Sequence, residues 1–228
     1  MRLFHGSEQV IRQPSLAAAR PHNDYGPGFY CTDAPDRAGE WACKNRTDGF
    51  INEYKLNLDG LAILDLLDGN YTVLHWIALL LKNRTFDLQE PSAREAREFL
   101  INNYAPDLTN VDIVIGYRAD DSYFAYAQAF VQNSLPLRLL EQALHLGKLG
   151  EQIVLVSDHA FEHLQFTDAR FVNATEYYPK FRQRDSAARW AYRELVGSGH
   201  SLVEDRFVFD IIREGGVGDD ARIRRNLP

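Results

Sequence analysis

The sequence predicts an α+β fold, because strand-like and helical runs follow one another without the regular alternation of a doubly wound sheet. The apolar strand-like runs lie near the start of the chain and again after residue 150, and most of the stretch between them has helical patterns. The chain has 228 residues, of which 45% are hydrophobic, so it can bury a sizeable core. No repeat or low-complexity linker divides it.

Apolar runs bounded by turn residues predict the strands. The third and fourth runs are separated by Asp59-Gly60, a pair typical of a turn. The predicted strands cover residues 2–4, 28–32, 50–57, 61–65 and 152–157.

Helical spacing of apolar residues predicts the helices. Ser92, with Glu95 three positions later, is predicted to cap one of them, and Asp185 is predicted to cap another. The predicted helices cover residues 36–44, 71–82, 92–103, 121–133, 137–146, 186–196 and 207–214.

Charge and composition narrow the class of protein. The net charge of −7 argues against a broad nucleic-acid-binding surface. No run of eighteen apolar residues and no signal-peptide pattern occur, so we expect a cytoplasmic protein with no membrane partner. Cys31 and Cys43 fit reduced thiols, and the histidines form no ligand pattern, so we expect no metal.

Two segments near the amino terminus carry the chemistry. A short apolar strand ends in His5, Gly6 and Ser7, where small residues let the backbone approach a ligand. About twenty residues later comes the run Tyr25-Gly26-Pro27-Gly28-Phe29-Tyr30, in which two glycines and a proline predict a tight turn before a strand. Together they have the character of an NAD-binding site.

The order of these residues resembles the ADP-ribosyltransferase superfamily, whose sites hold a His-Tyr-Glu triad or a variant of it. The run from Tyr25 to Tyr30 is similar to the Tyr/Phe-Gly-x-Gly-aliphatic-Tyr motif of poly-ADP-ribose polymerases. The whole pattern is similar to a bacterial domain of unknown function, 3990, within that superfamily. Two further matches support it, the run Gly116-Tyr117-Arg118-Ala119-Asp120-Asp121 and the run Gln152-Ile153-Val154-Leu155.

The resemblance implies the architecture. It places an ADP-ribosyltransferase-like domain with a split β-sheet core, and NAD between two β layers, over residues 1–175, with a helical insertion at about residues 70–147. Residues 176–228 are expected to form a helical C-terminal tail that packs on this core.

The resemblance also assigns roles. His5 would hydrogen-bond a ribose hydroxyl, and the Gly6 backbone would bind the nicotinamide carboxamide. Tyr30 and Trp41 would sandwich the nicotinamide ring. Further cofactor-binding positions, which match the motifs or adjoin them, are Ser7, Tyr25, Gly28, Thr32 and Ala38.

The third triad position is open between two neighbours. Adjacent side chains on a strand face opposite ways, so only one of Glu151 and Gln152 can enter the site, and the resemblance favours Gln152. A glutamine holds a hydroxyl but cannot take its proton. Asp120 or Asp121 is an alternative source of a carboxylate.

The implied activity is that of a mono-ADP-ribosyltransferase, a glycosyltransferase-class enzyme that cleaves NAD, releases nicotinamide and transfers ADP-ribose to a macromolecule. A protein acceptor is favoured over a nucleic acid. The resemblance allows a bacterial toxin or effector with an antitoxin or immunity partner. Two alternatives are an NAD glycohydrolase, with water as acceptor, and a non-catalytic module that binds NAD or ADP-ribose.

Overall fold

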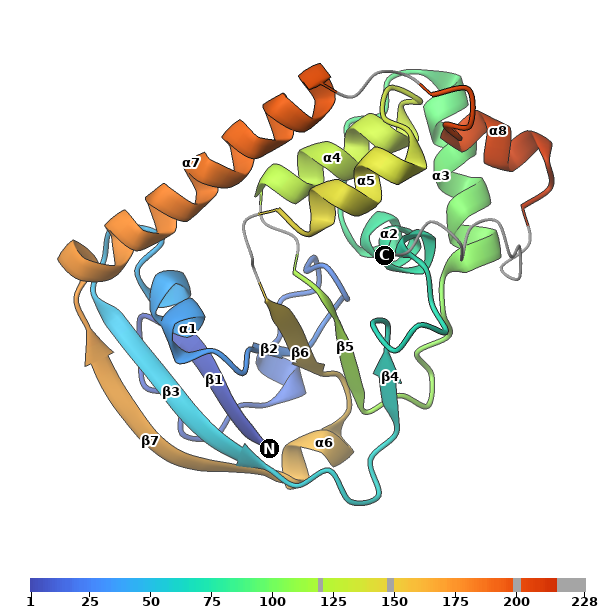
Figure 1. Cartoon of the computed structure of the whole chain (residues 1–228). Coiled ribbons are helices and arrows are strands. Elements are labelled where there is room, and N and C mark those ends of the chain that lie inside the picture. The colour runs from blue at the N-terminus through green and yellow to red at the C-terminus, as the bar shows by residue number, and fades with distance from the viewer. Residues whose placement is uncertain (119–120, 147–149, 199–201, 217–228) are drawn as a thin grey trace. The chain divides into compact units, whose positions relative to one another are not determined.

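The chain divides into two compact units. The computed structural model describes residues 1–118, 121–146, 150–198 and 202–216 (Figure 1). Unit 1 comprises residues 1–65, 108–118 and 149–186, and unit 2 comprises residues 66–107, 119–148 and 187–228. The fold is of the mixed α+β class, with all strands in unit 1 and most helices in unit 2.

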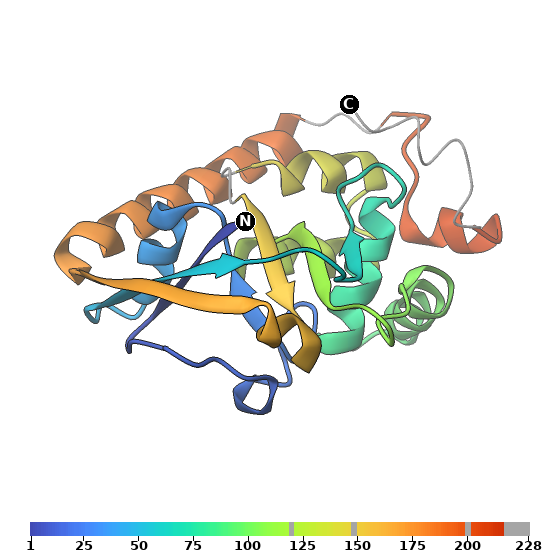
Figure 2. The ribbon, with the colours of Figure 1, turned by 90° about the horizontal axis from the view of Figure 1, so that it is seen from below.

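Unit 1 contains two β-sheets (Figures 1 and 2). The first is antiparallel, in the order β1 (Arg2–Ser7), β3 (Gly49–Leu56), β7 (Leu164–Val172). The second has the order β2 (Phe29–Cys31), β6 (Glu151–Leu155), β5 (Ile113–Tyr117), β4 (Ile63–Asp65). In the second sheet, β4 and β5 are parallel and the other pairs are antiparallel.

Each of the five predicted strands is present, with ends shifted by a few residues. The predicted set omits β5 and β7. The run Ile113-Val114-Ile115 in β5 carried a usable signal, since three β-branched residues in succession favour a strand. β7 lies at the edge of its sheet and its side chains are mostly exposed or half-buried, so it lacks a clear apolar alternation.

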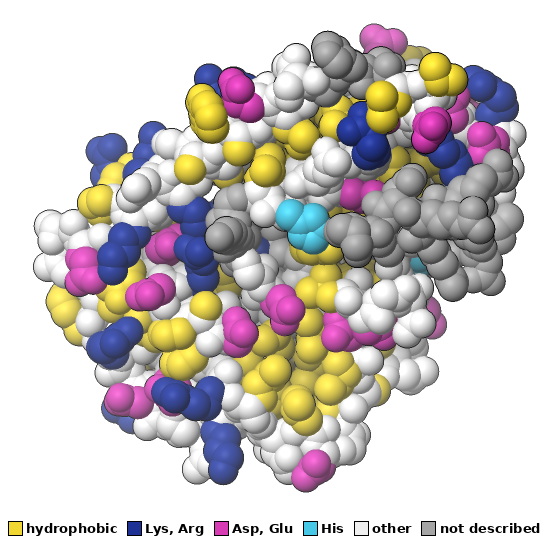
Figure 3. Space-filling model, in the orientation of Figure 1, with side chains coloured by type: hydrophobic (Ala, Val, Ile, Leu, Met, Phe, Trp, Pro, Cys, Tyr) yellow, Lys and Arg dark blue, Asp and Glu magenta, His cyan; other side chains and the backbone are white. Residues whose placement is uncertain are grey.

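Alternation along β1 separates two apolar cores in unit 1. Leu3 belongs to the core between the sheets, together with Cys31, Tyr54 and Ile153. This core has half-buried members at its margin, and apolar side chains are visible at the surface around β5, β6 and α6 (Asp158–Glu162) in Figure 3.

The second core lies on the opposite face of the first sheet, beneath α1 (Pro35–Ala42). Phe4 contributes to it from β1, Ala38 from α1 and Tyr177 from α7 (Ala174–Ser198). A buried ion-pair network also joins these helices: the Glu40 carboxylate lies 2.6 Å from Arg37 Nη1 and 2.7 Å from Arg184 Nε.

α7 begins at Ala174, so the predicted helix start at Ser186 was wrong. Asp185 is buried inside the helix and is not its cap. The Asn173 side chain serves the helix start instead, since its Oδ1 accepts a hydrogen bond from the Thr175 N–H at 2.7 Å. Pro179, a residue type that usually ends helices, lies within α7 and obscured its true length. The division between the units falls inside this helix.

Unit 2 is helical in its described residues. Its helices are α2 (Val73–Asn83), α3 (Pro91–Tyr104), α4 (Asp121–Val131), α5 (Leu137–Leu144) and α8 (Val208–Arg213), with the last part of α7. α3 begins with Pro91 as its first residue, so the predicted cap at Ser92 was wrong. Proline suits this position because its ring presets the helical φ angle. Among the helices described, none has the length and apolarity that a bilayer crossing requires.

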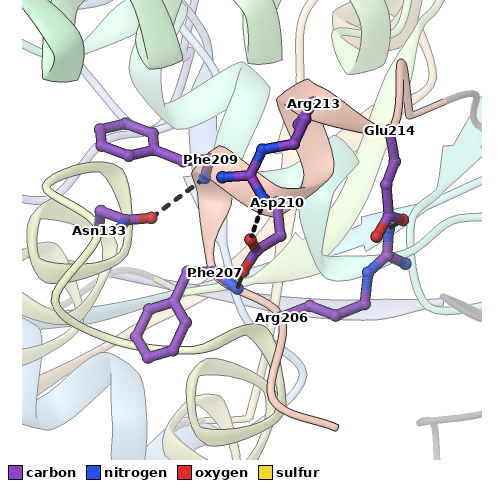
Figure 4. A network of polar contacts seen from close by, with 7 residues as sticks. All are labelled: Asn133, Arg206, Phe207, Phe209, Asp210, Arg213 and Glu214. Atoms are coloured by element: carbon purple, nitrogen blue, oxygen red, sulfur yellow. Dashed lines mark hydrogen bonds and ion pairs between the residues drawn. The ribbon is translucent and has the colours of Figure 1, made fainter. Parts of the chain in front are cut away.

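A short polar network fixes α8, which the sequence predicted as residues 207–214 (Figure 4). Asp210 Oδ2 accepts the Phe207 N–H at 3.0 Å and so caps the helix. Asn133 Oδ1 accepts the Phe209 N–H at 3.1 Å, and the Leu137 N–H donates to the Arg206 carbonyl at 2.8 Å. These bonds hold α8 against the connection between α4 and α5.

Glu141 on α5 makes the stability of the fold depend on pH, which tests the packing of unit 2. Burial raises its pKa from 4.5 to about 8, and within the described residues neither carboxylate oxygen has a hydrogen-bond partner. Between these pH values the folded chain holds a proton that the unfolded chain releases, so the free energy of unfolding falls as the pH rises from about 4.5 to about 8.

We therefore expect Glu141→Gln to flatten this slope. One pKa unit corresponds to about 1.4 kcal/mol, so the variant should exceed the wild type by at least about that amount at pH 8 and match it near pH 4.5. Urea unfolding at several pH values measures the difference. If the free energy of unfolding changed with pH to the same extent in both proteins, this would contradict a buried, protonated Glu141.

Candidate functional site

The two sheets of unit 1 part between β1 and β2. One bridge joins these strands, where the Phe4 N–H donates to the Thr32 carbonyl at 2.8 Å and the Thr32 N–H donates back at 2.9 Å. In a continued antiparallel ladder Gly6 would next pair with Tyr30. No such bridge exists among the described residues, and His5 Nδ1 lies 2.7 Å from the Tyr30 carbonyl oxygen instead. The imidazole thus takes the place of the Gly6 N–H.

This contact fixes the tautomer of His5. A carbonyl oxygen only accepts, so Nδ1 must carry the proton and Nε2 must present a lone pair in the neutral ring. Burial lowers the pKa of His5, opposed by the bond to Tyr30, and the ring stacks on Phe29 with centroids 4.4 Å apart. The imidazole is neutral and fixed in orientation, so its Nε2 is suited to accept a hydrogen bond from a hydroxyl.

The backbone N–H and C=O of Gly6 point toward the place where β1 and β2 separate, here called the parting. Phe4 directs its N–H and C=O toward β2, and Gly6, two residues on, directs its own to the same side. A Cβ at Gly6 would lie 1.9 Å from the Ala38 carbonyl oxygen. The glycine is therefore required for α1 to pack on β1, and Ala38 is fully buried at that contact.

Asn52 organises the chain that follows β1. Its Nδ2 lies 2.9 Å from Ser7 Oγ, and its Oδ1 accepts the Ile11 N–H at 2.8 Å. Ser7 Oγ in turn donates to the Gln9 carbonyl at 2.6 Å, so Ser7 belongs to this local network. Asn52 was not among the residues predicted from the sequence. Its signal was a polar residue on the same strand face as buried Tyr54 and Leu56.

The hydroxyl of Tyr30 holds the turn that precedes it. It donates to the Gly26 carbonyl at 2.6 Å and accepts the Tyr25 N–H at 3.0 Å, while the Tyr25 hydroxyl donates to the Tyr117 carbonyl at 2.5 Å. Gly26 has a φ of 83°, which favours glycine. A Cβ at Gly28 would lie 2.6 Å from Val154 Cγ1. Tyr25 and Gly28 thus support the site, and the half-buried Tyr30 ring is placed by its own turn.

Strand register assigns Gln152 and Glu151 to opposite faces. Tyr30 pairs with Val154 across β2 and β6, so Gln152, two residues from Val154, shares the face of Tyr30. Gln152 is 6% exposed, and its Oε1 has no hydrogen-bond partner within the described part of the chain. Glu151 is exposed on the other face. Partial burial, Asp33 and Asp65 raise its pKa.

Asp120 lies outside the described residues, and the side chain of Asp121, the first residue of α4, does as well.

α1 carries Trp41 beside Gly6, since a Cβ at Gly6 would lie 2.8 Å from the backbone nitrogen of Ala42, the residue that follows Trp41. Ala38 of this helix packs with Phe4, and Phe4 is bridged to Thr32, two residues from Tyr30. Thr32 is fully buried, and its Oγ1 accepts the Ala34 N–H at 3.2 Å just before α1. The Trp41 Nε1 is buried and lacks a hydrogen-bond partner among the described residues.

Arg118 covers the Trp41 ring. It directly follows β5, and its guanidinium carbon lies 4.0 Å from the ring centroid. The whole residue is 9% exposed. Arg118 lies in the run from Gly116 to Asp121 but had no predicted role, because no spacing rule links residue 118 to residue 41.

The structure thus gathers His5, Gly6, Tyr30, Trp41 and Gln152 where β1 and β2 part. Elsewhere in unit 1, a surface hollow at the start of β1 contains none of the predicted site residues; it is lined by Met1, Arg2, Glu53, Tyr54, Lys55 and Thr167. Within the described residues no three metal-ligating side chains gather. Cys31 and Cys43 are buried free thiols.

A family model described as "Protein of unknown function (DUF3990)" matches residues 1–166, which include all the gathered residues. The chain belongs to the DUF3990 family. No curated protein and no solved structure matches this DUF3990 chain. The description of this family names no activity.

We expect Gly6→Ala to destabilise the protein strongly. The added methyl group meets backbone atoms of α1, which must shift away from β1, and overpacking of this kind costs about 1–3 kcal/mol. Gly197→Ala is the matched control, because a Cβ there meets no atom within 4 Å and alanine favours a helix by about 1 kcal/mol. Thermal unfolding compares the two. Equal melting temperatures for Gly6→Ala and wild type would refute the close packing of α1 on β1.

Proposed function

We propose that this DUF3990 protein has a split sheet of the ADP-ribosyltransferase type and is a mono-ADP-ribosyltransferase. It binds NAD at the parting of β1 and β2, cleaves the bond between nicotinamide and ribose, and transfers ADP-ribose to a protein. One observation carries the proposal. The imidazole of His5 replaces a backbone bond to Tyr30, which leaves Gly6 facing the parting beside Tyr30, Trp41 and Gln152.

Each group has a chemical task in this reaction. His5 Nε2 accepts a ribose hydroxyl, and the Gly6 N–H and C=O bind the carboxamide. The nicotinamide ring lies against Tyr30 and Trp41. When the bond breaks, its electron pair stays on the nicotinamide nitrogen, and positive charge develops on the ribose as in glycoside cleavage.

Gln152 limits the kind of acceptor. Its Oε1, buried without a partner among the described residues, supports a hydrogen bond from a ribose hydroxyl. An amide cannot take a proton from the acceptor, so the nucleophile must attack without a protein base at this position.

A second candidate function follows from the same residue. An amide at the third triad position also suits a module that binds NAD or ADP-ribose without turnover. Glycohydrolysis, with water as acceptor, remains the alternative that the fate of the label separates.

The test uses NAD labelled in its adenylate portion, with cell lysate as the source of acceptors. It measures both the nicotinamide released and the label retained on protein. We expect Trp41→Leu to reduce release at least about tenfold, because the ring loses its stacking surface. Trp190→Leu, at a tryptophan that is 63% exposed, is the matched control and should retain full release.

The outcomes separate the candidates. Label retained on protein in a Trp41-dependent way supports the transferase. Release without retained label indicates a glycohydrolase, and NAD binding without release indicates a binding module. Failure to bind both NAD and ADP-ribose contradicts all three.

A further inference from the structure

Trp41 has an occupant in this structure. The Arg118 guanidinium lies 4.0 Å from its ring centroid, and both side chains belong to unit 1. Tryptophan gives the strongest cation–π contact of the aromatic residues, and the planar guanidinium stacks on it well. Arg118 is 9% exposed, so this contact places a charged group on the ring in largely water-excluded surroundings.

The proposed reaction needs the same ring surface. The nicotinamide of NAD is a flat pyridinium cation, which resembles a guanidinium in charge and in its ability to stack. Gly116 of β5 pairs with Gln152, so by strand alternation Arg118, two residues beyond Gly116, extends from the face of the second sheet that Gln152 and Tyr30 share. A ring held between Tyr30 and Trp41 and a guanidinium stacked on Trp41 therefore compete for one place.

We propose that Arg118 is a positioning residue that occupies the nicotinamide place on Trp41, yields it to NAD and retakes it after cleavage. The inference rests on the proposed function. During cleavage the carbon–nitrogen bond breaks and its electron pair neutralises the pyridinium, so the product ring loses its cation–π attraction to Trp41. The guanidinium keeps its charge and displaces the neutral nicotinamide.

While Arg118 stacks on Trp41, a ligand that needs this ring can bind only to the fraction of chains in which Trp41 is uncovered. Its apparent affinity is the intrinsic affinity multiplied by that fraction. A cation–π contact of ordinary strength makes that factor about fivefold to tenfold. Removing the guanidinium should therefore strengthen the binding of nicotinamide itself, which carries no phosphate that could interact with Arg118 in another way.

The experiment is calorimetric titration of the whole chain with nicotinamide and, separately, with NAD. Arg118→Met keeps the length of the side chain and removes its charge, and we expect it to bind nicotinamide about fivefold more tightly than wild type. Arg118→Lys retains a cation and should stay within about twofold of wild type. A purely structural role for Arg118 predicts weaker binding or a lower melting temperature in both variants.

A measurement on the wild-type chain covers the case in which Arg118→Met does not fold. In the NMR spectrum, the Trp41 ring current should shift the Arg118 Nε–H resonance. Saturating nicotinamide should abolish this shift. An unchanged resonance, or unchanged nicotinamide affinity in Arg118→Met, overturns this inference while Trp41-dependent NAD binding still supports the proposed function. No binding of either ligand to any of the proteins overturns both.

Discussion

The hydrogen bond from the His5 imidazole to the Tyr30 carbonyl is the contact on which the site depends. It lies where the ladder begun by Phe4 and Thr32 would continue, and it satisfies a carbonyl that would otherwise need the Gly6 N–H. Because a side chain meets this requirement, β1 and β2 can separate without leaving the Tyr30 carbonyl unsatisfied. The same bond sets the tautomer of His5 and leaves the Gly6 backbone directed at the parting.

The motif residues are each constrained by more than a ligand. Gly6 is needed by the packing of α1 as well as by any molecule at its backbone, and the Tyr30 hydroxyl is engaged by the Gly26 turn. Gly39 of α1 is also constrained by packing, since a Cβ there would lie 2.3 Å from the ring of Tyr177. A substitution at such a position changes the scaffold and the site together, so loss of activity alone does not identify a ligand contact.

Local patterns predicted much of the fold, and the opposite faces of Glu151 and Gln152 followed from strand alternation alone. The failures have physical causes. Asp185 and Ser92 looked like caps because capping residues also occur within helices, and Pro179 hid the start of α7. Asn52 and Arg118 act across long sequence separations, through a strand pair and a cation–π contact that no local spacing encodes.

The charges around Gln152 constrain how cleavage can proceed. Glu151 lies on the other strand face, near Asp33 and Asp65, so its carboxylate is not aimed at the side of Tyr30. Arg118, by contrast, brings a positive charge to Trp41. A guanidinium beside a ribose that is gaining positive charge would raise the barrier. The proposed exchange on Trp41 avoids this conflict, because the arginine returns only when the departing ring has become neutral.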